Sequence, residues 1–191
     1  KKTDALPAVE TKPAAAQPQA TPQCTAANTV RASIVALAQP IFLNRLGTVI
    51  PGGMVFALEN DAVGAQLRAD KRPRPIVLRA NVGDCIEIKL TNKIPAANFK
   101  ITTTTPNPQT SEVSLHVQGM EWVNGPQDDG AFVGRNNSSL ATPSPPQNPP
   151  PAGTTWPPNQ QTYTLYAKAE GTFLMYSMGD TSSIGSHITN G

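Results

Sequence analysis

The sequence predicts an all-β protein, a sandwich or barrel built from many short strands. Short segments rich in Val, Ile, Thr, Tyr and Phe recur along the chain, and this is the composition of strands. Turn signals made of Gly, Pro, Asn and Asp separate them, as at 51–53, 81–84, 124–126 and 170–171. Sustained helical periodicity is missing from the sequence, although residues 62–69 have the composition for one or two helical turns before Pro73.

The expected strands follow from these segments in chain order. The first two are the apolar runs at 29–38 and 54–59. A strand at 76–80 and another at 85–91 flank the turn sequence Asn-Val-Gly-Asp, and alternation in the latter places Val82, Ile86, Ile88 and Leu90 on one face. The remaining strands are expected at 112–118, 162–167 and 172–178.

The length of 191 residues favours one domain with long appendages over two domains. Residues 1–28 are expected to be a disordered Pro/Ala-rich tether, because residues 1–23 contain only one Leu and one Val. Residues 29–191 form the expected domain. Within it, residues 135–159 are interpreted as a Pro-rich loop, since proline withholds the amide donors that an inner strand needs.

Charge and hydropathy exclude several function classes. The net charge is +2, and the 15 basic residues are scattered among 13 acidic ones, so no nucleic-acid partner is expected. No apolar run approaches the roughly 20 residues that span a bilayer, so no membrane span is expected. A start at Lys1 without Met, followed by a solvated tether, favours removal of a signal peptide and an extracellular, cell-surface or periplasmic location. A cytosolic protein, or a boundary chosen for expression, would look the same.

The two cysteines are predicted to form a disulfide. Cys85 shares the polar face of its strand with Glu87 and Lys89, and Cys24 stands where the tether meets the first apolar segment. A Cys24–Cys85 bond would attach the tether to the outside of the barrel. The alternative is two independent thiols, because pairing cannot be deduced from sequence alone.

Four motifs in consistent order resemble the N-terminal domain of multicopper oxidases: PIVLRANVGDCIEIKLTN, SLHVQGMEW, DGAFVG and YTLYAKAEGTFLMYS. The upstream stretch ALAQPIFLNRLGTVIPGGMVFALEND is similar to the large bacterial manganese-oxidase type. This resemblance implies a cupredoxin-like Greek-key β-barrel or sandwich that lacks its final strand, because the family continues with a hydrophobic strand after the Asn-Gly at 190–191. The open edge would be completed by the remainder of the same polypeptide or by a neighbouring subunit.

The copper ligands that the resemblance implies are eroded. Two His-x-His pairs in the family hold half of a trinuclear copper cluster, whereas this sequence reads His116-Val117-Gln118 and Tyr176-Ser177-Met178. Three of four nitrogen donors are lost, so no catalytic residue is expected, and copper is expected only in the wider protein.

A residual metal site at His116 and Met178 remains a candidate, with Met120 and Met175 nearby, because one imidazole with thioethers suits Cu(I). The alternative is that the methionines fill the core and His116 is hydrogen-bonded. His187 is interpreted as a solvated loop histidine.

Other site types have less support. Asp128-Asp129-Gly130 is interpreted as turn chemistry rather than a Ca²⁺ site, since too few oxygen ligands cluster there. A blue-copper centre would need a cysteine beside two histidines and a methionine, and the C-terminal strand pair contains none.

Two function classes follow. In the first, the chain is the non-catalytic first cupredoxin domain of an exported multicopper oxidase that oxidises metal ions or phenols with dioxygen, and it belongs to an enzyme only through copper sites in other domains. In the second, it is a metal-free structural or interaction barrel in a surface assembly or filament. Downstream His-x-His and His-Cys-His motifs would favour the first class, and a neighbour's strand in the open edge the second.

Overall fold

The structure is a computed structural model that describes residues 24–51, 53–95, 112–131, 139–143, 158–179 and 188–190. Outside these residues lie positions 1–23 of the predicted tether at 1–28, most of the Pro-rich loop, and His187.

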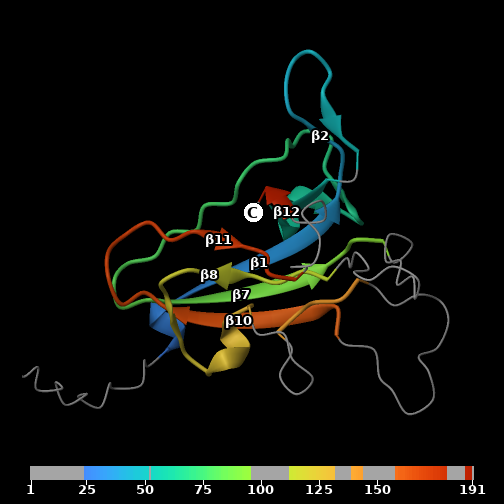
Figure 1. The fold of residues 1–191 in the computed structure, drawn as a ribbon. Helices are drawn as coiled ribbons and strands as arrows, with labels where there is room; N and C mark the ends of the chain where they lie inside the picture. Colours follow the sequence, from blue (N-terminus) through green and yellow to red (C-terminus); the bar gives the residue numbers. More distant parts are fainter. Residues whose placement is uncertain are drawn as a thin grey trace, which may run out of the picture.

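A mixed five-stranded sheet forms the body of the molecule (Figure 1), which confirms the prediction of a β-rich fold. Its order is β4-β1-β7-β10-β9, and β12 lies beside β4 at one edge. Strands β1 and β7 are parallel, whereas β4, β10 and β9 join the sheet antiparallel. Apart from strands, the described residues contain three 3-10 turns and no α-helix. The strands are β1 (Thr29–Ala38), β4 (Met54–Leu58), β7 (Cys85–Asn92), β9 (Glu121–Trp122), β10 (Gln160–Tyr166) and β12 (Ile188–Asn190).

The main core lies on one face of this sheet. Alternation in β7 turns Ile86, Ile88 and Leu90 inward as predicted, and Tyr163 and Leu165 of β10 join them. A second layer covers this face, formed by the short strands β8 (His116–Val117) and β11 (Met175–Tyr176) and by a bridge between Val113 and Ala141. The fold is therefore a two-layered β arrangement.

The opposite face carries a smaller core of Val35, Leu37, Val55 and Ala57. A hairpin of β5 (Ala62–Val63) and β6 (Gln66–Leu67) covers it, so the helical turns expected at 62–69 are wrong. The reason is local, because Gly64 adopts a φ of 59° in a two-residue loop and a two-residue hairpin turn needs such a positive φ.

The described strands do not close into a barrel. The strand expected at 76–80 is extended but pairs with no described strand. Pro73 and Pro75 lack the N–H groups that pairing would use at the start of this segment. Val82 lies in an exposed turn rather than on the inner face with Ile86, which corrects its predicted position. The two long strands expected at 112–118 and 172–178 shrink to the two-residue pair β8 and β11.

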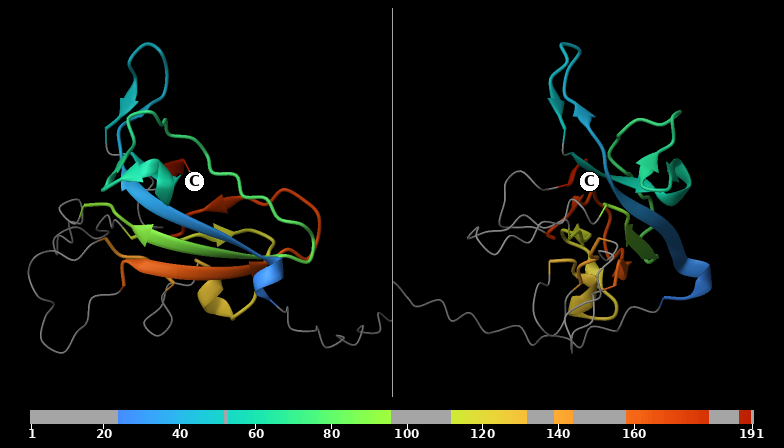
Figure 2. Two further views of the ribbon diagram at one scale, coloured as in Figure 1. Left: turned by 180° about the vertical axis from the view of Figure 1, so that it is seen from behind. Right: turned by 90° about the vertical axis from the view of Figure 1, so that its right-hand side faces the viewer.

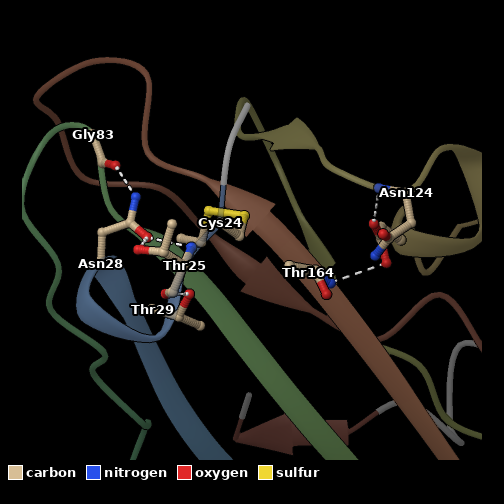
Figure 3. Close-up of a disulfide and its surroundings, with 9 residues drawn as sticks. Cys24, Thr25, Asn28, Thr29, Gly83, Asn124 and Thr164 are labelled. Carbon is tan, nitrogen blue, oxygen red and sulfur yellow. Dashed lines mark hydrogen bonds between the residues drawn. A yellow bond between two sulfur atoms is a disulfide. The ribbon is translucent and has the colours of Figure 1, made fainter. Parts of the chain in front are cut away.

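The Cys24–Cys85 disulfide is confirmed, with 5.7 Å between the Cα atoms (Figure 3). Cys85 is fully buried rather than outward, because it lies between Thr29 of β1 and Tyr166 of β10 and is bonded to Cys24. Residues 24–28 were predicted to belong to the disordered tether, but they form an ordered turn. In this turn the Thr25 N–H donates to Asn28 Oδ1 over 2.6 Å.

Part of the Pro-rich loop belongs to the core. Residues 139–143 are buried, and the Ala141 N–H donates to the Val113 carbonyl over 2.8 Å. The buried Tyr163 hydroxyl donates to the Ser139 carbonyl, and Gln161 Nε2 donates to the Leu140 carbonyl over 2.9 Å. Residues 139–143, which the proline-rich composition predicts to be a solvent-exposed loop, therefore form part of the buried core.

A hairpin of β2 (Ile41–Phe42) and β3 (Val49–Ile50) projects from the body, as Figures 1 and 2 show. Asn44 orders its loop, because Asn44 Oδ1 accepts the Leu46 N–H over 2.9 Å and Asn44 Nδ2 donates to Thr48 Oγ1 over 3.0 Å. The exposed fraction is 93% for Leu46 and 74% for Phe42, so this ordered tip presents apolar side chains to solvent.

Candidate functional site

His116 occupies the outer face of the β8–β11 pair. Its neighbours Leu115 and Val117 point into the main core, and alternation turns the imidazole the other way. Register places His116 opposite Tyr176, and the two rings meet edge to face with centroids 5.1 Å apart and an interplanar angle of 70°. The strands thus bring together one residue from 116–118 and one from 176–178, the two segments that the sequence resemblance singled out.

The turn at 125–130 holds a carboxylate against this imidazole. His116 Nδ1 lies 2.8 Å from both the backbone carbonyl and Oδ1 of Asp129. Gly130, with a φ of 70°, passes so close to Leu115 that a Cβ built on it would lie 2.1 Å from the Leu115 carbonyl oxygen. Glycine at this position therefore allows the turn to approach β8 and deliver Asp129 to the ring.

Asp128 anchors the same turn from the inside. This carboxylate is buried and accepts the N–H of Asn124 over 2.7 Å and the N–H of Thr164 over 3.0 Å (Figure 3). The adjacent acidic residues therefore have different tasks, since Asp128 joins the turn to β10 while Asp129 binds His116. This arrangement agrees with the interpretation of the segment as turn chemistry.

The pattern of acceptors defines the chemistry of His116. Because both groups facing Nδ1 are acceptors, Nδ1 carries the proton of the neutral ring and Nε2 keeps a lone pair. Among the residues that the structure describes, Nε2 has no hydrogen-bond partner. A carboxylate behind Nδ1 is the arrangement that orients a histidine as a metal ligand or proton acceptor. The site offers one such nitrogen, and the side chain is 20% exposed.

Met178 lies further along the same segment as Tyr176. Its N–H donates to Ser114 Oγ over 2.9 Å, which extends the β8–β11 pairing beyond the last strand residue. The structure thus places residues 116 and 178 on adjacent paired segments, and the imidazole faces the phenol ring of Tyr176. Met120 and Met175 pack against the main core, as the gap-filling alternative expects.

These residues do not fit a trinuclear copper cluster. Within the described ranges no group of three or more His, Cys, Asp and Glu side chains is placed to hold a metal ion. Gln118 is exposed, and the ring that faces His116 is the phenol of Tyr176. A single oriented nitrogen beside a phenol cannot hold several Cu(II) ions. His187 lies outside the described residues.

The Asp-Gly dipeptide at 129–130 predicts a turn, but it does not show that Asp129 contacts His116.

No protein-family model matches this chain, and no curated protein matches its sequence. None of the described helical turns has the length and apolarity to cross a membrane.

Proposed function

We propose that the chain is the non-catalytic first cupredoxin-like domain of an exported multicopper-oxidase-like protein. In this proposal the oxidation of metal ions or phenols with dioxygen takes place at copper sites in other domains. The remainder of the polypeptide, or neighbouring subunits, completes the open edge of this domain. No catalytic residue is assigned to this chain.

The observation that carries the proposal is the pairing of His116 with Tyr176. The two motifs that resemble the family's copper-binding pairs lie on adjacent antiparallel strands and face each other in register. The two positions that would hold copper ligands therefore lie opposite each other, but the side chains there are one imidazole and one phenol. Matched positions without nitrogen donors support a cupredoxin-like domain that has no oxygen-reducing centre of its own.

The disulfide supports export. Disulfides persist in secreted and periplasmic proteins and are rare in the reducing cytosol. The Cys24–Cys85 bond is consistent with an extracellular, cell-surface or periplasmic location.

Copper analysis of the natively purified protein tests the proposal, together with the intact mass of every polypeptide that co-purifies. The expected result is several copper ions per assembly and a covalent or tightly bound remainder. The matched variant is His116→Gln, which should leave the copper content unchanged because the copper lies elsewhere. Loss of copper in His116→Gln would place a metal in this domain, and copper-free protein made only of this chain would contradict the oxidase assignment.

A second candidate function is a metal-free structural or interaction domain in a surface assembly or filament. The hairpin tip favours it, because Asn44 orders a loop that exposes Leu46 and Phe42, and apolar residues presented on an ordered loop are typical of protein interfaces. Sedimentation of the Phe42→Ser/Leu46→Ser double variant tests this role. Loss of assembly there, with assembly intact in the control Val63→Ser, would support the second function.

A further inference from the structure

Residues 72–80 run between β6 and β7 as an extended segment that pairs with no described strand (Figure 1). Ile76 and Leu78 pack against the main core, while Val77 between them is 72% exposed, which is β-type alternation. In the described part of the chain, residues 72–80 make no backbone hydrogen bond. Together with residues 169–175 the segment borders an apolar groove. Side chains therefore hold this segment, and its backbone groups are open to a partner.

An exposed, extended backbone is the conformation in which a protease binds its substrate. The substrate forms backbone hydrogen bonds with the enzyme in the manner of an added strand. A protease of the trypsin type also takes one basic side chain into a pocket that contains a carboxylate. A bond that is cleaved in a folded protein therefore needs an extended chain, unpaired N–H and C=O groups and an exposed basic residue, whereas a bond within a paired strand needs local unfolding first.

Three arginines lie in this segment, and proline protects two of them. Arg72 and Arg74 are each followed by proline. Proline has no N–H and its ring fixes φ, so a bond that precedes proline fits such an active site poorly. Arg79 is followed by Ala80, and both residues are exposed. Within the described residues Arg79 has no ion-pair partner, so its guanidinium is available to the pocket of a protease.

The other described arginines lie in backbone that is already bonded. Arg31 belongs to β1 and pairs with β7 in the sheet. The Arg68 N–H donates to the Asp61 carbonyl over 2.9 Å. Arg45 lies in the loop of the β2–β3 hairpin, where Asn44 Oδ1 accepts the N–H groups of residues 46 and 48 and closes a tight turn. In the part of the chain that the structure describes, the bond after residue 79 alone follows an arginine and meets all three requirements.

The disulfide connects the two sides of this bond. Cys24 precedes the bond between residues 79 and 80, and Cys85 follows it. Strands β1 and β7 also lie on opposite sides of the bond, and they pair along their length. Hydrolysis at this position therefore leaves two chains that a covalent link and a shared sheet hold together.

We infer that Arg79–Ala80 is a processing site, at which an arginine-specific protease converts the folded chain into two chains that the Cys24–Cys85 disulfide keeps joined. Water adds across the peptide bond, so that the carbonyl carbon of Arg79 becomes a carboxylate and the nitrogen of Ala80 an ammonium group. The new end that contains Ile76 and Leu78 has only one covalent attachment, which frees this wall of the groove to move away from the core. The inference goes beyond the proposed function and does not depend on copper.

Limited digestion of the full chain with an arginine-specific protease tests the inference. All samples carry Arg135→Gln, because Arg135 lies outside the described residues. The first cut should create a new amino-terminus at Ala80, identified by mass spectrometry. On gels without reductant the cut protein should migrate as one disulfide-linked species, and reductant should separate residues 1–79 from residues 80–191.

Substitutions within the segment separate recognition of this bond from general unfolding. Arg79→Gln should remove the cut, whereas Arg74→Gln is the matched control and should be cut like the parent. Pro75→Ala should create a second cut after Arg74, because that position is exposed and proline is what protects its bond. Unfolding would not mimic this pattern, since an unfolded chain would also be cut after Arg31 and Arg45.

Three results would overturn the inference: a first cut after Arg31, Arg45 or Arg68, no cut in the folded chain under conditions that cleave the urea-unfolded chain, or separation of the two fragments without reductant. Persistence of the cut in Arg79→Gln would also overturn it. The copper content of the assembly does not depend on this cut, so failure of the proposed function is distinguishable from failure of the processing site.

Discussion

Removal of the Cys24–Cys85 disulfide should lower the free energy of unfolding by about 4 kcal/mol. The bond joins residues 61 positions apart, and the loop-closure entropy of a loop of that size corresponds to about 4 kcal/mol at 25 °C. Both cysteines are changed to alanine, Cys24→Ala/Cys85→Ala, rather than to serine. Cys85 is fully buried, and a serine hydroxyl there could be left without a hydrogen-bond partner. At about 2–4 °C per kcal/mol for a domain of this size, the melting temperature should fall by about 8–16 °C.

Urea unfolding of the oxidised parent, the reduced parent and the double variant measures this effect. The reduced parent and the double variant should agree with each other and should show a steeper denaturant dependence than the oxidised protein, because an uncrosslinked unfolded chain exposes more surface. A reductant should leave the double variant unchanged. Equal unfolding free energies for the oxidised parent and the double variant, or two free thiols by alkylation under non-reducing conditions, would refute the reasoning.

Three further substitutions probe the turn beside His116 and the main core. Gly130→Ala should cost more than about 2 kcal/mol, because it combines a positive φ with a Cβ directed at the Leu115 carbonyl, whereas Gly64→Ala, with a similar φ and no atom within 4 Å, should cost about 1–2 kcal/mol by urea unfolding. Equal costs would contradict the proposed close approach. Asp128→Ala should cost about 2–4 kcal/mol because it leaves the Asn124 and Thr164 N–H groups without their acceptor, while Asp70→Ala at the surface should stay within about 0.5 kcal/mol of the parent in the same assay. Burial raises the pKa of Tyr163 above its ordinary value of about 10, so the unfolded state ionises first and stability should be lost as the pH rises above about 10. Tyr163→Phe should remove this part of the alkaline dependence in unfolding experiments over a pH series, and an unchanged dependence would exclude Tyr163 as its source.

The two aspartates of the turn have the same side chain but different surroundings and therefore different roles. Asp128 and Asp129 are adjacent in sequence, yet one is buried under β10 and the other binds an imidazole at the surface of the second layer. Asp128 is the last residue of the 3-10 turn at Pro126–Asp128, and Asp129 is its C-cap, so the two side chains leave the turn in different directions. The residue types in this segment predict a turn. Which group each aspartate contacts is decided by the packing of the turn against β8 and β10.

The four longer strands of the large sheet were predictable because their residues alternate or form apolar runs, whereas β9 and β12 were not predicted. β1 has the predicted limits, β4 and β7 each differ by one residue at the C-terminal end, and β10 begins two residues and ends one residue earlier than predicted. The short strands β8 and β11 were overestimated, and the hairpin of β2 and β3 was not expected. Pairing in a second layer depends on where neighbouring segments lie, and strand propensity contains no such information.

Residue type and alternation in the sequence were enough to give the β-rich class and the inward face of β7, and the presence of two cysteines left only one possible internal disulfide. Three features became visible only in the folded chain: Asp129 contacts His116, residues 139–143 of a Pro-rich stretch enter the core, and residues 75–80 border a groove instead of pairing. These features bring together segments between 13 and about 100 residues apart. A local pattern specifies which face of a strand is apolar, whereas the identity of the segment that covers it is settled by packing of the whole chain.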